Sequence, residues 1–378
     1  MRGSSSMDVS SIPRLCLSLI GFAFQRCRLS SDLCRLSVLL SSPSASNPSV
    51  LQVSISDTGV GSCLEEFHAF KCPSEAIASQ NWDGSLAVRT TSISDLEVYH
   101  YQLNLRETNP IRRLIRLPSK PKNGVKFSGT EVCLCLSESI HVLLAEIRKY
   151  FQKILVLNIP NVAIELVAEG ADIPGSRLEN VFLANEGNPL PSSASNIERL
   201  KSGLENYLLK HGQSLSQKCE CFPWKDLKVG SGTACSMESH RRSGLTVEVV
   251  IVLSEVEASC SHIKACSSKT EVYILSLVLY FKDFSPCSIP QSSLKALTSI
   301  DWKSFGLSLG DVDPDGHLIE WENSPSHIAM VVHSYHKQYP TLTFLILIVY
   351  FLAQVFCVIY IMQLPLTCRQ GYESISEA

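Results

Sequence analysis

Apolar and polar positions alternate over short runs in much of the first half of the chain, which is typical of half-buried β-strands. The stretch Val50–Gly61 organises this half, because an apolar, β-branched run ends at Asp57 and is followed by Gly59 and Gly61. Glycine permits backbone angles that side chains forbid, so the pattern predicts a strand, a tight turn and a short helix from Leu64. Such turns are common, and this one alone indicates no function.

The same patterns predict the other elements. Helices are expected over 15–40 (with breaks at Gly21 and near Ser30), 140–155, 197–210 and 294–299. Strands are expected over 86–91, 97–105, 129–136, 162–167, 245–253, 272–281, 317–321 and 328–335, with 245–253 and 272–281 as adjacent central strands. Asn123–Gly124 is typical of a hairpin turn. Helices interleaved with strands predict an α+β fold.

Shifts in composition predict five regions along the chain. A Ser-rich N-terminus is expected to be disordered, and a segment rich in Gly, Pro and Ser is expected to link two folded domains around a single helix. The predicted regions are a disordered N-terminus at 1–13, a first domain at 14–172, a linker with one helix at 173–240, a second domain at 241–338 and an apolar tail at 339–378.

Composition excludes some classes of protein. The 378 residues are 45% apolar, which is ample for a core and excludes a wholly disordered chain. The formal net charge of −3 indicates neither a histone-like nucleic-acid binder nor an acidic tail. The 15 cysteines include the C-x-C pairs Cys133/Cys135 and Cys219/Cys221, which lack the spacing of zinc knuckles. Reduced, buried thiols are the favoured interpretation.

Two apolar runs bear on targeting. Leu15–Phe24 has the length of a signal-peptide core, but no small-residue cleavage site follows, so a buried or amphipathic helix is favoured. The run 341–364 contains only Gln354 and Gln363 as strongly polar residues and is a candidate transmembrane helix. Two interpretations remain open: an anchor in the nuclear envelope or endoplasmic reticulum, or an alternative transcript end or wrongly assigned gene end that is foreign to the function.

The order of elements resembles a known ATP-binding fold. A helix, a strand ending in Asp57-x-Gly59-x-Gly61 and a later strand beginning Gly129–Thr130 are similar to the Bergerat (GHKL) α/β sandwich of gyrase, histidine kinases and MutL. The resemblance implies that Asp57 occupies the adenine-binding position and that Gly59, Gly61, Gly129 and Thr130 line the same nucleotide site.

Later segments narrow the resemblance. Residues 146–151 with 158–164 resemble the B-type component of topoisomerase VI, and 300–307 resemble its transducer domain. Residues 26–40 and 54–67 resemble the plant meiotic topoisomerase VI B-like family, and the whole resemblance covers about 14–338. It implies a degenerate GHKL domain at 14–172 and a transducer-like α/β domain at 241–338, with an apolar C-terminal helix beyond them.

The family resemblance also implies a function. In this family, a B-like subunit promotes assembly of a topoisomerase VI A-like transesterase, which supplies the tyrosine nucleophile and the Mg²⁺ site. The complex makes the DNA double-strand breaks that start meiotic recombination. This chain is therefore expected to be a nuclear subunit that reaches DNA through the complex. The alternatives are a membrane-anchored isoform and an interaction protein without break-forming activity.

Departures from the family pattern predict a pseudo-ATPase. Active members carry a Glu-x-x-x-Asn helix that supplies a general base and a Mg²⁺ ligand. No Asp, Glu or Asn occurs between Arg14 and Ser31, and no Gly-x-x-Gly-x-Gly phosphate lid occurs between Asp57 and Gly129. We therefore expect no catalytic residue and no metal ligand in this chain. The five residues of the resemblance form a vestigial site with weak nucleotide binding or none.

Three further patterns have competing interpretations. Basic residues either contact DNA phosphates or are solvated loop charges, with the second favoured. Residues 311–322 fit the EF-hand spacing, but Pro314 lies inside the loop, so calcium binding is not favoured. His327, His333 and His336 have no carboxylate or cysteine at a suitable spacing to complete a metal site, so exposed or strand-borne histidines are favoured. The basic residues are Arg112, Arg113, Arg116, Lys120, Lys122, Arg241 and Arg242.

Overall fold

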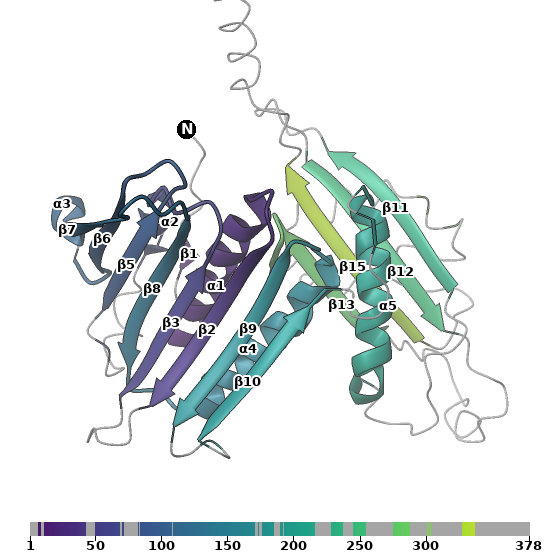
Figure 1. The fold of residues 1–378 in the computed structure, drawn as a ribbon. Helices are drawn as coiled ribbons and strands as arrows, with labels where there is room; N and C mark the ends of the chain where they lie inside the picture. Colours follow the sequence, from purple (N-terminus) through teal and green to yellow (C-terminus); the bar gives the residue numbers. More distant parts are fainter. Residues whose placement is uncertain are drawn as a thin grey trace, which may run out of the picture. The chain divides into compact units, whose positions relative to one another are not determined.

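An eight-stranded mixed sheet forms the first part of the protein in the computed structural model (Figure 1). The order is β10-β9-β2-β3-β8-β5-β6-β7; neighbouring strands are antiparallel except β2 and β9, which are parallel. The strands are β2 (Cys34–Ser42), β3 (Leu51–Asp57), β5 (Ser85–Thr91), β6 (Glu97–Asn104), β7 (Leu114–Pro121), β8 (Gly129–Leu136), β9 (Val162–Gly170) and β10 (Arg177–Leu183).

The structure describes part of the chain. The described residues are 7–8, 11–42, 50–68, 70–71, 82, 84–107, 109–170, 173, 176–184, 190–191, 193–215, 228–236, 245–254, 275–287, 301, 303 and 327–336. The predicted elements at 294–299 and 317–321, the EF-hand-like loop and the candidate span 341–364 lie outside them. No helix in the described part is long and apolar enough to cross a membrane.

Two helices, α1 (Ile12–Leu29) and α4 (Ile140–Ile154), pack against the first sheet and contact each other. The side chain of Ser11 accepts a hydrogen bond from the backbone N–H of Arg14, which caps the start of α1. Leu15 and Ile20 on α1 are fully buried, as is Phe151 on α4. These helices and the inward residues of the strands form one apolar core, and α1 is therefore the buried helix that the sequence favoured.

The helix predicted over 15–40 is wrong beyond Leu29. Residues 34–42 form β2, in which Leu36, Val38 and Leu40 are fully buried and the residues between them are not. This period of two matches a strand, and pairing with β3 and β9 places β2 inside the sheet. The predicted disorder over 1–13 is also wrong in part, because α1 starts at Ile12 and β1 (Met7–Asp8) pairs in parallel with β4 (Phe70–Lys71).

Several elements carry weak sequence signals. β7 and β10, at the two edges of the first sheet, were not predicted, and neither was β11 (Lys228–Ser236) in the second. Asn123 and Gly124 have φ of 51° and 82°, as a tight turn requires. This turn joins β7 to β8, which are not neighbours in the sheet, so it is not a hairpin. Short α2 (Glu65–His68), α3 (Pro110–Arg113) and η1 (Leu155–Leu157) complete the first part.

The helix α5 (Asn196–Leu215) precedes a second, five-stranded sheet. Its order is β11-β12-β15-β13-β14, built from β12 (Leu245–Ser254), β15 (His327–His336), β13 (Leu275–Lys282) and β14 (Ser285–Pro286). The strands β12 and β13 were predicted to be adjacent, but β15 lies between them and pairs with β13 in parallel. Both parts are mixed α+β structure. The predicted domain boundaries stay predictions.

A buried histidine lies in the middle of the second sheet. His333 on β15 is 1% exposed, and the Phe284 ring stands edge-on to it with ring centroids 4.4 Å apart. Burial, with the positive charge of Arg28, lowers the pKa of His333 to about 3. The imidazole is therefore neutral at pH 7. Its 4.0 Å contact with Glu248 is consequently not an ion pair between two charges.

We predict that His333 makes the protein sensitive to acid. Because its folded pKa lies below the unfolded value, only the unfolded state gains a proton as the pH falls below about 6.5. Above that pH His333 does not lower the free energy of unfolding. As the pH falls from there towards about 3, the free energy of unfolding declines. The expected loss at pH 5 is about 2 kcal/mol. Urea unfolding at pH 7 and pH 5 should show a smaller difference for His333→Gln, whereas the exposed His141→Gln should behave as wild type.

Candidate functional site

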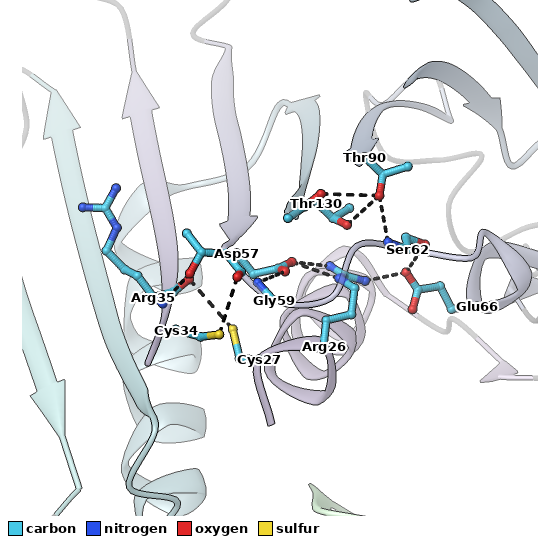
Figure 2. Close-up of polar contacts among 12 residues, drawn as sticks. Arg26, Cys27, Cys34, Arg35, Asp57, Gly59, Ser62, Glu66, Thr90 and Thr130 are labelled. Carbon is cyan, nitrogen blue, oxygen red and sulfur yellow. Dashed lines mark hydrogen bonds and ion pairs between the residues drawn. The ribbon is translucent and has the colours of Figure 1, made fainter. Parts of the chain in front are cut away.

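The five residues predicted for the vestigial site lie together at one end of the first sheet, and Figure 2 shows three of them, Asp57, Gly59 and Thr130. Asp57 ends β3 and is the register partner of Thr130 at the start of β8, beside Gly129. The backbone N–H of Gly59 donates to Asp57 Oδ1 at 3.0 Å, which closes the turn. Gly61 reaches the backbone of β5 at Thr91. The sequence thus located one site, and nucleotide binding there stays a prediction.

The carboxylate of Asp57 is bound by an arginine of the same chain. Arg26, in the last turn of α1, donates from Nε and Nη2 to Asp57 Oδ2 at 2.9 and 2.7 Å. The two side chains are only 5% and 0% exposed. The remaining Nη1 of Arg26 donates to Glu66 on α2, so the guanidinium lies between two carboxylates (Figure 2). Both oxygens of Asp57 therefore have partners within the protein.

Electrostatics keep this arginine charged. Burial alone lowers the pKa of Arg26, but the charges of Asp57 and Glu66 outweigh it and raise the pKa above its ordinary value. Burial likewise raises the pKa of Asp57, against the charge of Arg26 and the N–H of Gly59. A charged guanidinium in this position requires its acidic partners, because a buried charge without one is very costly.

Hydrogen bonds continue from this ion pair across the site. Ser62 Oγ donates to Glu66 Oε1 at 2.5 Å, and the backbone N–H of Ser62 donates to Thr90 Oγ1 at 2.7 Å. The hydroxyl oxygens of Thr90 and Thr130 are 2.9 Å apart. One connected polar network therefore joins α1, the turn after β3, α2, β5 and β8 (Figure 2). We call it the Arg26 network.

The glycines of the turn meet protein backbone. A Cβ at Gly59 would lie 2.4 Å from the carbonyl carbon of Arg26, and one at Gly129 would lie 2.2 Å from the carbonyl oxygen of Asp57. Gly61 has φ of 70°, and its Cβ would lie 2.6 Å from the oxygen of Thr91. Gly61 and Gly129 (φ 151°) adopt backbone angles that disfavour side chains. Because these glycines have no side chain, the turn after β3 can pack directly against the backbones of α1 and β5, and the start of β8 against the end of β3.

Adenine would have to share the carboxylate of Asp57 with groups of the protein itself. The oxygen Oδ2 receives two hydrogen bonds from Arg26, and Oδ1 receives one from the backbone N–H of Gly59. The helix α1 contributes a cation and contains no Asp, Glu or Asn, the residue types expected for a base and a Mg²⁺ ligand. No cluster of three metal-ligating side chains occurs among the described residues.

Sequence reasoning missed Arg26, Glu66, Ser62 and Thr90. A signal for Arg26 did exist: it is three residues after Ala23 and seven after Leu19, which places it on the apolar face of α1. Arginine is almost never fully buried unless it is paired. Its position therefore implied an acidic partner, and Asp57 was available. Nothing in the local sequence indicated Glu66. Its role depends on the tertiary contact that brings α2 next to Arg26 on α1.

The other candidate residues are placed as follows. Arg112, Arg116 and Lys120 are exposed on α3 and β7. Lys122 is buried, with its ammonium group donating to the backbone oxygens of Ser92 and Phe127, so it is not available to DNA phosphates. Arg113 is partly buried on α3, and Arg241 and Arg242 lie outside the described residues. Buried thiols were predicted, and three free cysteines are buried: Cys16, Cys27 and Cys34. The prediction is wrong for the other free cysteines, because Cys133 is half-buried and Cys63, Cys135 and Cys287 are exposed.

One family model matches part of the second half of the chain. Residues 197–346 match the family model of the MTOPVIB middle domain. No curated protein matches the chain. The matched segment begins within α5 and includes the strands β11 to β15.

Solved structures show low similarity over most of the chain. The Aquifex aeolicus MutL ATPase domain complexed with ADP is 13% identical, covers 89% of this chain and 95% of its own, and has a TM-score of 0.34. The B-subunit of DNA gyrase from Myxococcus xanthus is 11% identical, with coverage of 86% and 79% and a TM-score of 0.37. The ATPase region of Saccharomyces cerevisiae topoisomerase II is 10% identical, with coverage of 83% and 70% and a TM-score of 0.34.

We predict that the Arg26 network is needed for folding. Arg26→Gln leaves Asp57 and Glu66 without their cation in a buried site, which should lower the free energy of unfolding by about 3–5 kcal/mol. Arg35→Gln is the matched control, because Arg35 is 66% exposed and meets Glu165 only at 3.9 Å. Its effect should stay within about 0.5 kcal/mol. Equal unfolding midpoints in urea for the two variants would contradict the role of the network.

Proposed function

We propose that this chain, a meiotic topoisomerase VI B-like protein by the MTOPVIB middle domain at residues 197–346, is the non-catalytic subunit of a topoisomerase VI-like complex. It acts in the nucleus and promotes assembly of the A-like transesterase subunits. Cleavage of DNA and the start of meiotic recombination belong to those partners. The family match is the observation that carries this proposal.

The Arg26 network supports the non-catalytic part of the proposal. In an ATPase of this fold, the strand-end carboxylate is kept for adenine, whereas here Asp57 is bound to Arg26 inside the protein. Displacing Arg26 would leave a buried guanidinium beside Glu66 with one partner fewer, which costs several kcal/mol. A nucleotide would have to supply that free energy before it gained any contact. The first domain is therefore proposed to keep one conformation whether or not ATP is present.

Contact with DNA is proposed to be made through the complex. The exposed basic residues of α3 and β7 supply few charges, and Arg116 lies over the ring of Tyr99 at 4.9 Å from its centroid. Phosphate contacts by a few such side chains give weak, salt-dependent binding without sequence preference. We therefore assign the principal DNA contacts to the A-like partner.

Co-purification of the full chain with its A-like partner tests the proposal. Tagged full-length chain should retain the A-like protein, and the yield should be the same with ATP, with ADP or with EDTA, since the Arg26 network needs no nucleotide. Tag alone is the control. Failure of the two proteins to associate would refute the proposed subunit role, and association only in the presence of ATP would refute its independence of nucleotide.

We also predict that the protein does not hydrolyse ATP. Purified chain should release phosphate from ATP no faster than buffer, because no described residue near Asp57 is placed as a base or a metal ligand. Asp57→Asn keeps the size of the side chain and removes the charge, and it should leave this background rate unchanged. A measurable rate that Asp57→Asn abolishes would show that the site is a working ATPase.

A further inference from the structure

Two neighbouring loops of the first sheet carry large apolar residues that are exposed to solvent. The loop between β5 and β6 supplies two of them, and the loop between β7 and β8 supplies the other two. Both loops leave the end of the sheet that carries the Asp57 turn. The four residues, which we call the loop patch, are between 42% and 84% exposed: Ile93, Leu96, Val125 and Phe127.

The two loops are held against each other by Lys122. Its backbone N–H donates to the oxygen of Leu96 at 2.9 Å, and its buried ammonium group donates to the oxygens of Ser92 and Phe127 at 2.6 and 2.7 Å. The strands β6 and β7 are paired with each other up to these loops. The loop patch is therefore formed before any partner arrives, so little conformational entropy is lost on binding.

The loop patch has the character of a binding surface. Single exposed apolar side chains are normal, but a group of four on two adjoining loops is typical of an interaction site. Phe127 supplies the kind of aromatic side chain that is enriched in protein interfaces, and the ammonium group of Lys122 lies 4.9 Å from the centroid of its ring. Covering these residues with apolar groups of a partner removes them from water, which supplies free energy of binding.

Positive charge accompanies the loop patch. Three lysines, two exposed and one buried, lie at the end of β7 and in the loop that follows it: Lys120, Lys122 and Lys126. Among the described residues, no carboxylate forms an ion pair with any of them. The two carboxylates beside them have other partners, since Asp95 accepts from the N–H of Ser92 and Glu97 from the hydroxyl of Ser119. Carboxylates of a partner would therefore complement this surface.

From this arrangement we infer that the loop patch binds an acidic segment of a partner protein, in which large apolar side chains are interspersed with Asp or Glu. The apolar side chains cover the patch, and the carboxylates pair with the lysines beside it. Nucleic acid matches the lysines but leaves the four apolar residues in water. A bilayer is disfavoured, because the carboxylate of Asp95 lies between Ile93 and Leu96 in a loop that would have to enter it. The inference goes beyond the proposed subunit role, since it requires neither the A-like protein nor a nucleotide.

Selection of short random peptides on the full chain tests the inference, with affinities measured by fluorescence anisotropy. The recovered peptides should be enriched in Asp and Glu together with Leu, Ile and Phe. Combining Leu96→Ser with Val125→Ser should weaken their binding by about ten-fold or more, because two apolar contacts are lost. Combining Lys120→Glu with Lys126→Glu should weaken it by a similar factor of about ten and reverse its dependence on salt.

Controls separate the loop patch from other surfaces. Leu209→Ser removes an exposed leucine from α5, and Lys201→Glu reverses an exposed charge there, so both variants should bind the peptides as wild type does. Equal unfolding midpoints in urea show that all the variants fold, as substitutions at exposed positions should.

Several outcomes overturn the inference. They are recovery of no peptide, recovery of basic peptides, and peptides that bind the Leu96→Ser, Val125→Ser double variant as tightly as wild type. Binding to phosphatidylserine vesicles that this variant loses would identify the patch as a membrane contact instead. Self-association in the ultracentrifuge that this variant loses would identify a second copy of the chain as the occupant. Each of these outcomes leaves the co-purification result unaffected.

Discussion

The first domain depends on one buried ion pair. The buried side chain of Arg26 on α1 binds the carboxylate of Asp57 at the end of β3. This ion pair joins the helix to the sheet where β3 ends. The buried guanidinium of Arg26 needs its acidic partners, because an unpaired charge in the core is costly. The positions of α1, of the turn after Asp57 and of α2 with Glu66 therefore depend on one another. The same bonds hold the Asp57 turn together and occupy its carboxylate.

Much of the first sheet could be predicted because its strands are rich in β-branched and aromatic residues, and β3, β8 and most of β5 alternate buried and less buried positions. β3, β5, β6, β8 and β9 were located within a few residues, and so were α4 and α5. The errors have physical causes. β2 follows a helix without a strong breaker, so the two apolar patterns merge. The edge strand β7 is mostly exposed, and the edge strand β10 alternates exposed and half-buried residues, so neither has a fully buried face. The order of strands in the second sheet depends on long-range pairing, which no local pattern encodes.

The residues predicted for the nucleotide site lie close together, but the prediction that they form such a site stays a prediction. Asp57, Gly59, Gly61, Gly129 and Thr130 do come together, since a strand end and a strand start in one antiparallel pair fix their meeting. The side chains that contact these residues lie far away in the sequence. Arg26 is 31 positions before Asp57, and Thr90 is 40 positions before Thr130.

The parallel pairing of β2 with β9 has a consequence for synthesis of the protein. Ser37 and Glu165 are hydrogen-bonded across this pair although 128 positions separate them. The N-terminal helix and the β2–β3 hairpin can form as soon as they leave the ribosome, yet β2 lacks its second neighbour until β9 emerges. Non-local pairing of this kind slows folding and exposes an open strand edge in the meantime. Chaperone protection of the nascent chain is thus most needed while roughly its second hundred residues are being made.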